Sequence, residues 1–234
     1  MDIFKRRSLL ALLALPTGCA IQYLQPLQTS QLSSGASVGA LRAPALGQSW
    51  TYQKFNFYNS QRLDTVKEQV VDMAGGIRIS RRSQDNLDLG DEFQPVWGQV
   101  TQDPYWDSLQ TYETPLPLWL DNFAVGTSQA NDTRYLSGRS SFRYWINART
   151  TVAGWEKLTL PSGTFETVRI EKLIRLNHPD ISRLDTLRRE TLWLAPEIGR
   201  WVARETNGEF RIAGKRGSWT GREDHFRWQL ESWT

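Results

Sequence analysis

The chain has 234 residues, 39% of them hydrophobic and 23% charged, with a formal net charge of +3 at pH 7, and this length is enough for one domain with a sizeable core. Residues 1–18 hold three basic side chains and one acidic side chain, so the rest of the chain carries about +1, which excludes the strongly basic surface of a typical nucleic-acid-binding domain. The single cysteine excludes an intramolecular disulfide.

Residues 1–18 are predicted to be an export signal. Lys5, Arg6 and Arg7 precede the apolar run of residues 8–15, the arrangement of a secretory signal peptide. The run is too short to cross a bilayer, which takes about 20 apolar residues. The Arg6-Arg7 pair also resembles a twin-arginine export motif, so the general secretory route and the twin-arginine route both stay open.

The signal ends in Thr17-Gly18-Cys19, which resembles the lipobox of bacterial lipoproteins. This resemblance implies that the signal is cut before Cys19 and that Cys19 carries the acyl chains, which hold the protein firmly on a membrane. Ala20, rather than an aspartate, follows the cysteine, which implies sorting to the periplasmic face of the outer membrane. Pro16 departs from the aliphatic residue usual at its position, so ordinary signal cleavage is the alternative.

Residues 19–46 are predicted to be a flexible tether. There is no charged residue between Ala20 and Leu41, and Gln, Ser, Leu and Gly dominate. A flexible segment of about 25 residues has a root-mean-square reach of roughly 25 to 30 Å, enough to lift a domain off the lipid headgroups. The folded domain is therefore expected to be single and to occupy residues 47–234.

After residue 47 the apolar pattern has mainly the period of two that indicates half-buried strands. Residues 49–58 alternate with one slip near Lys54, which predicts a bulge. Gly75-Gly76 predicts a hairpin turn. Residues 226–231 show the cleanest one-sided alternation. We therefore expect a mainly β fold with little helix, in which a single antiparallel, strongly curved sheet forms a half-barrel or open barrel.

Two further hairpin turns are predicted, one at Pro161-Ser162-Gly163 and one at Asn207-Gly208. Residues 180–187 fit either a short helix or the start of a strand. The basic pairs Arg81-Arg82 and Arg188-Arg189 are interpreted as solvated strand faces.

The segment 93–123 is rich in aromatic residues and prolines, and prolines disfavour central strands. We expect it to form a long loop that lies over the sheet as a lid. Its aromatic side chains either close a binding cavity or fill it. The candidate ligand-facing residues are Trp97, Tyr105, Trp106, Tyr112 and Trp119.

Two motifs in the last third of the chain resemble a pattern of uncharacterised bacterial periplasmic proteins and lipoproteins. These are the Pro-x-Gly-x-Phe hairpin at residues 161–165 and the Trp-x-Ala-Pro-x-x-Gly turn at residues 193–199. The resemblance implies antiparallel β architecture with a curved or half-closed sheet. It brings no known activity.

No catalytic, cofactor or metal signature is found. His178 and His225 are isolated and lack metal-ligand spacing, and neither a nucleophile elbow nor a phosphate-binding loop is present. The carboxylates of Asp91, Glu92, Glu113, Asp121 and Glu190 could pair for glycoside chemistry only if the fold brought two of them together, and we expect them to be solvated at the surface. We expect a protein without a cofactor or metal, and we consider an enzyme the weakest class.

The leading hypothesis is a non-enzymatic, outer-membrane-anchored lipoprotein that binds an amphiphilic ligand or another envelope component in an aromatic concavity. A scaffold or assembly accessory that binds another envelope protein is the first alternative. A glycan-binding module that uses exposed tryptophans is the second. The expected partners are the membrane, through Cys19, and one of these ligands; nucleic acid is not expected.

Overall fold

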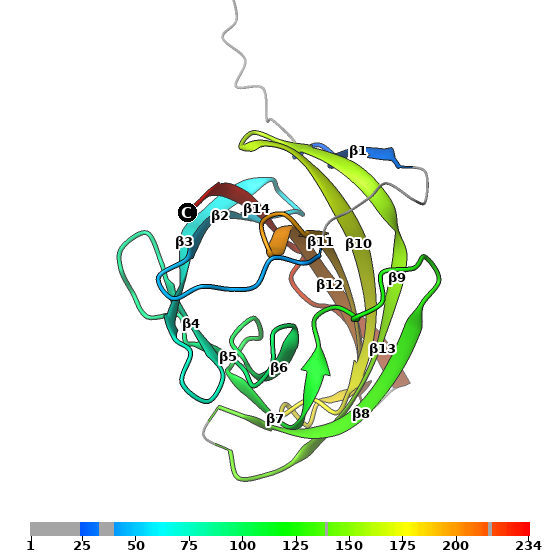
Figure 1. The fold of residues 1–234 in the computed structure, drawn as a ribbon. Helices are drawn as coiled ribbons and strands as arrows, with labels where there is room; N and C mark the ends of the chain where they lie inside the picture. Colours follow the sequence, from blue (N-terminus) through cyan, green and yellow to red (C-terminus); the bar gives the residue numbers. More distant parts are fainter. Residues whose placement is uncertain (1–23, 33–39, 139, 215–216) are drawn as a thin grey trace, which may run out of the picture.

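The structure is a computed structural model that describes residues 24–32, 40–138, 140–214 and 217–234. Within these residues it contains fourteen β-strands and no helix (Figure 1). The strands are β1 (Gln28–Gln31), β2 (Ser49–Asn56), β3 (Gln61–Asp72), β4 (Ile77–Arg82), β5 (Glu92–Gln94), β6 (Gln99–Asp103), β7 (Gln110–Pro117), β8 (Ser128–Ser137), β9 (Tyr144–Leu160), β10 (Gly163–Leu176), β11 (Arg183–Ala195), β12 (Arg200–Gly214), β13 (Gly217–Arg222) and β14 (Phe226–Trp233).

The strands form one antiparallel sheet that closes on itself. Neighbours run in the order β9-β10-β11-β12-β14-β2-β3-β4-β5-β6-β7-β8, and β8 pairs with β9 to complete a ring of twelve strands (Figure 1). β1 pairs with the outer part of β9, and β13 pairs with β12 beyond the ring. The expected mainly β fold with a curved antiparallel sheet is confirmed, and the barrel is closed rather than half open.

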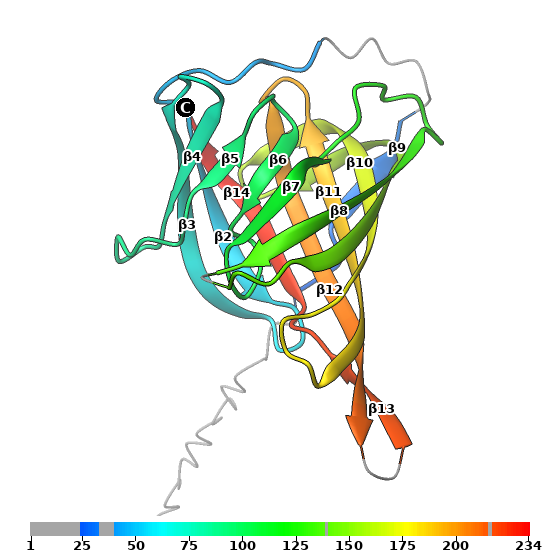
Figure 2. The ribbon, with the colours of Figure 1, turned by 90° about the horizontal axis from the view of Figure 1, so that it is seen from below.

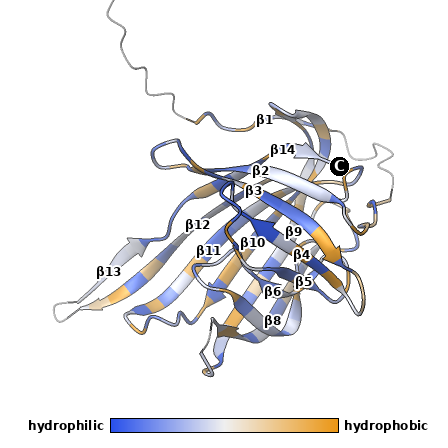
Figure 3. Cartoon of the chain, turned by 90° about the vertical axis from the view of Figure 1, so that its left-hand side faces the viewer, coloured by the Kyte–Doolittle hydropathy of each residue, from blue (hydrophilic) through white to orange (hydrophobic). Residues whose placement is uncertain are grey.

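A ring of twelve strands encloses a wider lumen than an eight-stranded one, so small side chains cannot fill it. The period-two pattern sends large side chains inward: Trp50, Tyr52 and Trp201 are fully buried. Polar and apolar residues alternate along the strands, as the hydropathy colouring in Figure 3 shows. The abundance of tryptophan is therefore explained in part by the volume of this lumen.

The barrel has two distinct ends. At the first, which we name the closed end, lie the turns that contain Gly98 and Gly199 and the start of β2. At the second, the open end, lie the β2–β3 turn and the β6–β7, β10–β11 and β12–β13 connections. Figure 2 shows β13 projecting from the open end. The register of β2 with β14 fixes these directions, since Trp50 pairs with Trp233 and Asn56 pairs with Phe226.

Most of the predicted local features are confirmed. The pairing of β2 with β3 shifts register between Lys54 and Phe55, where the bulge was expected. Gly75 and Gly76 have positive φ in the β3–β4 turn, and β10 begins at Gly163 directly after the β9–β10 turn. Residues 183–187 belong to β11, so this part of the segment 180–187 forms a strand and not a helix.

The predicted turn at Asn207-Gly208 is wrong, because both residues lie inside β12 and pair with Arg189 and Arg188 of β11. A Cβ at Gly208 would lie 2.3 Å from Oε2 of Glu223. The glycine therefore allows the chain that precedes β14 to approach β12 closely, a role that its sequence neighbours do not reveal.

The segment 93–123 is not a loop that covers the sheet: it supplies most of β5 and all of β6 and β7. The prolines still interrupt strand pairing, but only on the side of β7 that faces β8. β7 pairs with β8 only from Gln110 to Tyr112, and the pairing stops before Pro115, whereas Pro117 still lies opposite Gln99 of β6. An imino nitrogen cannot donate to a neighbouring strand, so proline is tolerated where pairing ends.

Parts of the segment expected as a tether lie against the barrel. β1 pairs with residues 156–159, and the N–H of Arg42 donates to the carbonyl of Pro196 at 2.9 Å. Residues 40–48 cross the closed end between the β11–β12 turn and β3 (Figure 1). The export signal and Cys19 lie outside the described residues.

Candidate binding site at the open end of the barrel

The β6–β7 connection, residues 104–109, folds into the lumen and forms the floor of the open end. Nη1 of Arg81 donates to the carbonyl of Pro104 at 3.1 Å, and Nη2 of Arg188 donates to the carbonyl of Tyr105 at 3.3 Å. The Tyr105 hydroxyl donates to the carboxylate of Glu68. Two buried arginines and a buried carboxylate thus hold a short loop inside the barrel, where its backbone would otherwise lack partners.

Trp106 lies on this floor, half-buried. Its Nε1 lies 3.0 Å from both the Asp103 carboxylate and the Tyr112 hydroxyl, and the Arg188 guanidinium lies 4.1 Å from its ring centroid. Burial alone would raise the pKa of Asp103, but Arg204 and the hydrogen bonds to this carboxylate outweigh it and lower the pKa. Asp103 is therefore a fixed anion that orients the indole ring.

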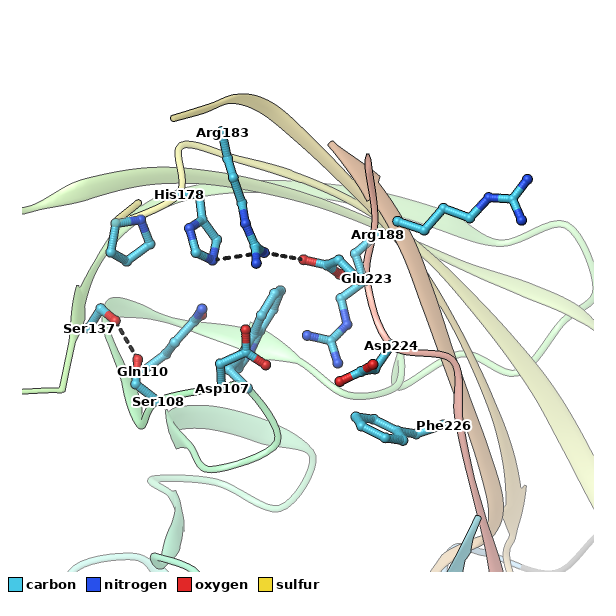
Figure 4. Close-up of a pocket in the computed structure, with 13 residues that line it drawn as sticks. Asp107, Ser108, Gln110, Ser137, His178, Arg183, Arg188, Glu223, Asp224 and Phe226 are labelled. Carbon is cyan, nitrogen blue, oxygen red and sulfur yellow. Dashed lines mark hydrogen bonds and ion pairs between the residues drawn. The ribbon is translucent and has the colours of Figure 1, made fainter. Parts of the chain in front are cut away.

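Two adjoining cavities open above the floor. The first, about 220 Å³, lies beside the β10–β11 connection, and the second, about 460 Å³, extends toward β2 and β3. Five residues line both of them: Trp106, Asp107, Arg188, Asp224 and Phe226. Figure 4 shows the first cavity, with Asp107, Arg188 and Asp224 pointing toward the same space. Charged and aromatic side chains share this wall, which is the composition of a site for a ligand with both polar and apolar parts.

The outer rim of the first cavity is built around Arg183. Its Nη1 lies 3.8 Å from Oε1 of Glu223 and 3.4 Å from Nε2 of His178 (Figure 4). Burial raises the pKa of the Glu223 carboxyl, opposed by the positive charges of Arg188 and Arg183. Burial, followed by the charge of Arg183, lowers the pKa of His178, so this imidazole is neutral at pH 7.

Lys54 enters the second cavity from β2. Its ammonium lies 3.9 Å from the ring centroid of Phe226 and 5.4 Å from that of Trp228. Burial, followed by the charge of Arg81, lowers the pKa of Lys54. An ammonium over aromatic rings is stabilised by the ring faces, so this partly buried wall can accommodate a cation.

Below the floor, toward the closed end, lies a buried ionic cluster centred on Arg200. The Arg200 guanidinium donates to Glu68 at 2.7 and 3.0 Å and to Glu92 twice at 3.1 Å. Arg81 donates to the other oxygen of Glu68 at 3.1 Å. Gln94 donates to Glu92, which ties the cluster to the β5–β6 turn. Both carboxylates of this cluster are engaged by an arginine, so their charges are neutralised inside the barrel.

A second buried pair lies on β11 and β12, where Nε of Arg204 and Oε1 of Glu190 are 2.5 Å apart. The angle of this contact is poor for a hydrogen bond, and Nη1 of Arg204 has no acceptor among the described residues. Lys172 of β10 lies opposite Glu190 in the sheet, and burial lowers its pKa. This part of the lumen is polar and incompletely hydrogen-bonded.

The aromatic residues selected from the sequence are divided between the two ends. Trp97 and Trp119 fill the closed end, where their ring centroids are 5.4 Å apart and Trp97 stacks on Trp50 at 6.4 Å. Tyr105 and Trp106 lie at the open end and line the second cavity, and the hydroxyl of Tyr112 supports Trp106 from behind. The structure thus brings two of the five to a cavity wall.

Sequence reasoning missed the charged residues of the lumen. Only one member of each basic pair is solvated: Arg82 and Arg189 are exposed, whereas Arg81 and Arg188 are buried. A signal was present, because Arg81 is in phase with the inward-facing Ile77 and Ile79 of the same strand. A charged residue in phase with an apolar face is a better indicator of a polar interior than the composition of the pair.

The described residues contain no cluster of three or more His, Cys, Asp or Glu side chains that could hold a metal ion. At the mouth, Ser108 and Ser137 bond to each other at 2.5 Å, and Nδ1 of His178 accepts the N–H of Asp180. No serine is hydrogen-bonded to a histidine in the part of the chain that is described.

No helix among the described residues has the length and apolar character needed to cross a membrane. No protein-family model matches the chain, and no curated protein matches its sequence.

Two solved structures have similar folds. A crystal structure named as a "putative exported protein with YmcC-like fold", from Bacteroides fragilis, is 13% identical, has a TM-score of 0.51, and covers 83% of this chain and 99% of its own. A "putative lipoprotein" from Parabacteroides distasonis is 14% identical, has a TM-score of 0.49, and covers 81% of this chain and 96% of its own. The first similarity establishes a shared fold.

Proposed function

We propose that this chain is a non-enzymatic lipoprotein of the bacterial cell envelope, anchored to the outer membrane through Cys19, that binds an amphiphilic ligand at the open end of its barrel. The observation that carries the proposal is the pair of cavities above the loop of residues 104–109, whose shared wall combines two aromatic rings with Arg188 and two carboxylates. The anchor is supported by the sequence of residues 1–19, and the names of proteins with this fold agree with export.

The polar part of the ligand fits the inner wall. Gln110 lines the first cavity and is 4% exposed, and its Oε1 has no partner among the described residues. A buried amide oxygen without a donor is costly, and a hydroxyl or amine from a ligand, or a water, would remove that cost. The charged residues around it have both signs, so a zwitterionic or hydroxyl-rich group suits the site better than a simple anion.

The apolar part fits the rings of Phe226 and Trp228, which line the second cavity with the Lys54 ammonium over them. A volume of about 460 Å³ is in the range of small-molecule sites and too small for several acyl chains. The cavities therefore suit the headgroup of an amphiphile and the first part of its chain.

The test is extraction of lipid from protein purified from membranes, followed by mass spectrometry and by titration of tryptophan fluorescence with the species found. We expect a co-purified amphiphile with the wild type and a several-fold weaker fluorescence response in Asp224→Ala, which removes a charge from the shared wall. The matched control is Asp121→Ala, because Asp121 is also exposed but lies at the closed end. Absence of any co-purified amphiphile, together with no response to added envelope lipids, would refute the proposal.

A glycan is the second candidate ligand, and the smaller cavity favours it. Its wall presents the hydroxyls of Ser108 and Ser137, the amide of Gln110 and the carboxylate of Asp107 beside the indole of Trp106, a mixture that suits sugar hydroxyls and a sugar face. Co-sedimentation with purified cell wall or capsular polysaccharide separates the two ligands. Loss of sedimentation in Trp106→Ala, with no co-purified lipid in the wild type, would favour the glycan.

A further inference from the structure

We infer that the open end of the barrel rests on the bilayer, so that the mouth of the cavities faces lipid rather than the periplasm. This inference rests on the proposed function, since it takes the N-terminal anchor as given. It adds an orientation and a contact surface.

The start of the described chain lies at the open end. The N–H of Leu24 donates to the hydroxyl of Ser60 in the β2–β3 turn, and the carbonyl of Gln25 accepts from Arg227 at the start of β14 at 2.6 Å. Cys19 is five residues before Leu24, and five residues span at most about 17 Å when fully extended. An anchor at Cys19 therefore keeps the Ser60 end of the barrel close to the membrane surface.

The rim of the same end exposes large apolar side chains from three separate parts of the chain. Phe142, before β9, is 65% exposed, Ile181 of the β10–β11 connection is 93% exposed, and Trp219 of β13 is 57% exposed. Phe142, Ile181 and Leu184 line one surface hollow of about 830 Å³. Side chains of this kind, carried on two connections and on the projecting β13 at one end of the barrel, suit insertion into the interfacial layer of a bilayer.

Arginines surround these apolar residues. Arg134 and Arg143 line the hollow that holds Phe142, and Arg175 and Arg211 line a neighbouring hollow that includes Trp145. Arg143 is already paired with Glu113 at 2.6 Å, and Arg211 lies 3.8 Å from Asp185, so the rim is not a plain basic patch. Guanidinium groups beside aromatic rings fit the phosphate level of a lipid headgroup layer.

Exposure of apolar residues does not by itself select this end, because Leu46 and Val96 at the closed end are 68% and 65% exposed. The position of Leu24 selects it. The closed end is also crossed by residues 40–48 (Figures 1 and 2), whereas the two cavities are lined by residues of the open end. With the mouth on lipid, an amphiphile can enter the cavity while its acyl chains remain in the membrane.

The experiment uses single cysteines, since Cys19 is the chain's only natural cysteine and its thiol is consumed by the thioether bond to diacylglycerol. Full-length Ile181→Cys, Val96→Cys and Leu173→Cys, purified in acylated form, are labelled with bimane and reconstituted into vesicles of phosphatidylethanolamine and phosphatidylglycerol that contain nitroxide-labelled lipid. Leu173 is on the outer wall of β10. The unsubstituted chain reports any labelling at Cys19.

We expect at least threefold stronger quenching at position 181 than at positions 96 and 173. Equal quenching at positions 181 and 96, or stronger quenching at position 96, in protein that floats with the vesicles would overturn the orientation and leave the ligand proposal intact. Failure of the acylated chain to float with the vesicles would overturn the orientation together with the anchor. The lipid-extraction experiment above is read independently of both.

Discussion

The closed and open ends of the barrel are built from the same strands, yet one is filled and the other is hollow. At the closed end Trp50 and Trp119 are buried, Trp97 stacks on Trp50, and the chain before β2 crosses over them. At the open end the loop of residues 104–109 stops short of the rim and leaves two cavities. The difference shows that a wide barrel needs added chain to fill it, and that a binding site remains where that chain ends.

The two ends also differ in how closely their charged side chains are paired. In the Arg200 cluster every charge meets an opposite charge at hydrogen-bond distance, whereas at the mouth Arg183 and Glu223 are 3.8 Å apart. The first arrangement stabilises the barrel only while it is complete, and the second leaves charges able to meet a ligand. The predictions below test whether the two ends really differ in this way.

The largest effect is expected for Arg200→Leu. The substitution leaves Glu68 and Glu92 buried, with Arg81 still bonded to Glu68 and with Glu92 deprived of the guanidinium that bonds both of its oxygens. Removal of one partner from a buried ionic cluster costs about 3 to 5 kcal/mol, so the urea midpoint should fall sharply. The control is Arg82→Leu on the exposed face of β4, which should change the free energy of unfolding by no more than about 0.5 kcal/mol. A cost below about 1 kcal/mol for Arg200→Leu would mean that the cluster is not structural.

Gly98→Ala should cause the next largest loss of stability, because it disturbs the packing of the side chains that fill the closed end. Gly98 has φ +88°, and a Cβ there would lie 2.4 Å from Nε1 of Trp119. Backbone strain and overpacking together should cost about 2 to 4 kcal/mol, measured by urea unfolding. Gly126 has the same φ and no atom within 4 Å of its Cβ position, so Gly126→Ala isolates the strain. If the two variants lose equal stability, Trp119 is free to move and the closed end is not tightly packed.

Asp103→Asn tests the floor that separates the two ends. The pKa of Asp103 is lowered in the folded protein, so its contribution to stability is present above its unfolded pKa of about 3.9 and is lost as the pH falls through the folded pKa. The variant should lose about 1 to 3 kcal/mol at pH 7, because an amide cannot accept all the donors that Asp103 accepts.

The same variant should also show a shallower loss of stability below about pH 4 than the wild type, with Glu68, whose pKa is also lowered, responsible for the remaining slope. Urea midpoints at pH 3, 4, 5 and 7 provide the comparison. Asp121→Asn, at the exposed closed end, is the matched control. Parallel pH profiles for wild type and Asp103→Asn would show that Asp103 carries no fixed charge.

The barrel walls were predictable from the sequence and its interior was not. Period-two alternation located β2, β3, β4 and β14, because a strand with one buried face must alternate. The same rule failed at Asn207-Gly208, where a strong turn signal was overridden by eleven register pairs along β11 and β12. Long-range pairing outweighs a local turn preference of this size.

The candidate site was predicted only in part. Tyr105 and Trp106 were selected because they lie in a segment rich in aromatic residues and prolines, and they line a cavity. Arg188 and Arg81 were assigned to solvent, since charged residues are rarely buried unless paired. Arg188 bonds the carbonyl of Tyr105, which is far away in the sequence, whereas Arg81 bonds Glu68, which lies directly opposite it across the β3–β4 hairpin. Where two carboxylates and two arginines meet inside a barrel depends on its closure, which no local pattern reports.

The smallest effect, and the most direct comparison of the two ends, is expected for Glu223→Gln. Burial raises the pKa of Glu223 in the folded protein above its unfolded value of about 4.3, so Glu223 lowers the stability of the wild type as the pH rises from that value through the folded pKa, and it contributes no further change outside this window.

The neutral glutamine removes this loss, so the variant should be more stable than the wild type at pH 7 by less than about 1 kcal/mol, and equal to it at pH 4. Urea midpoints at the two pH values measure the difference, with the more exposed Glu113→Gln as the control. Destabilisation of more than about 1 kcal/mol at pH 7 would mean that the pair with Arg183 outweighs burial. The charges at the mouth would then stabilise the fold by pairing with one another, as in the Arg200 cluster, and they would not be available to a ligand.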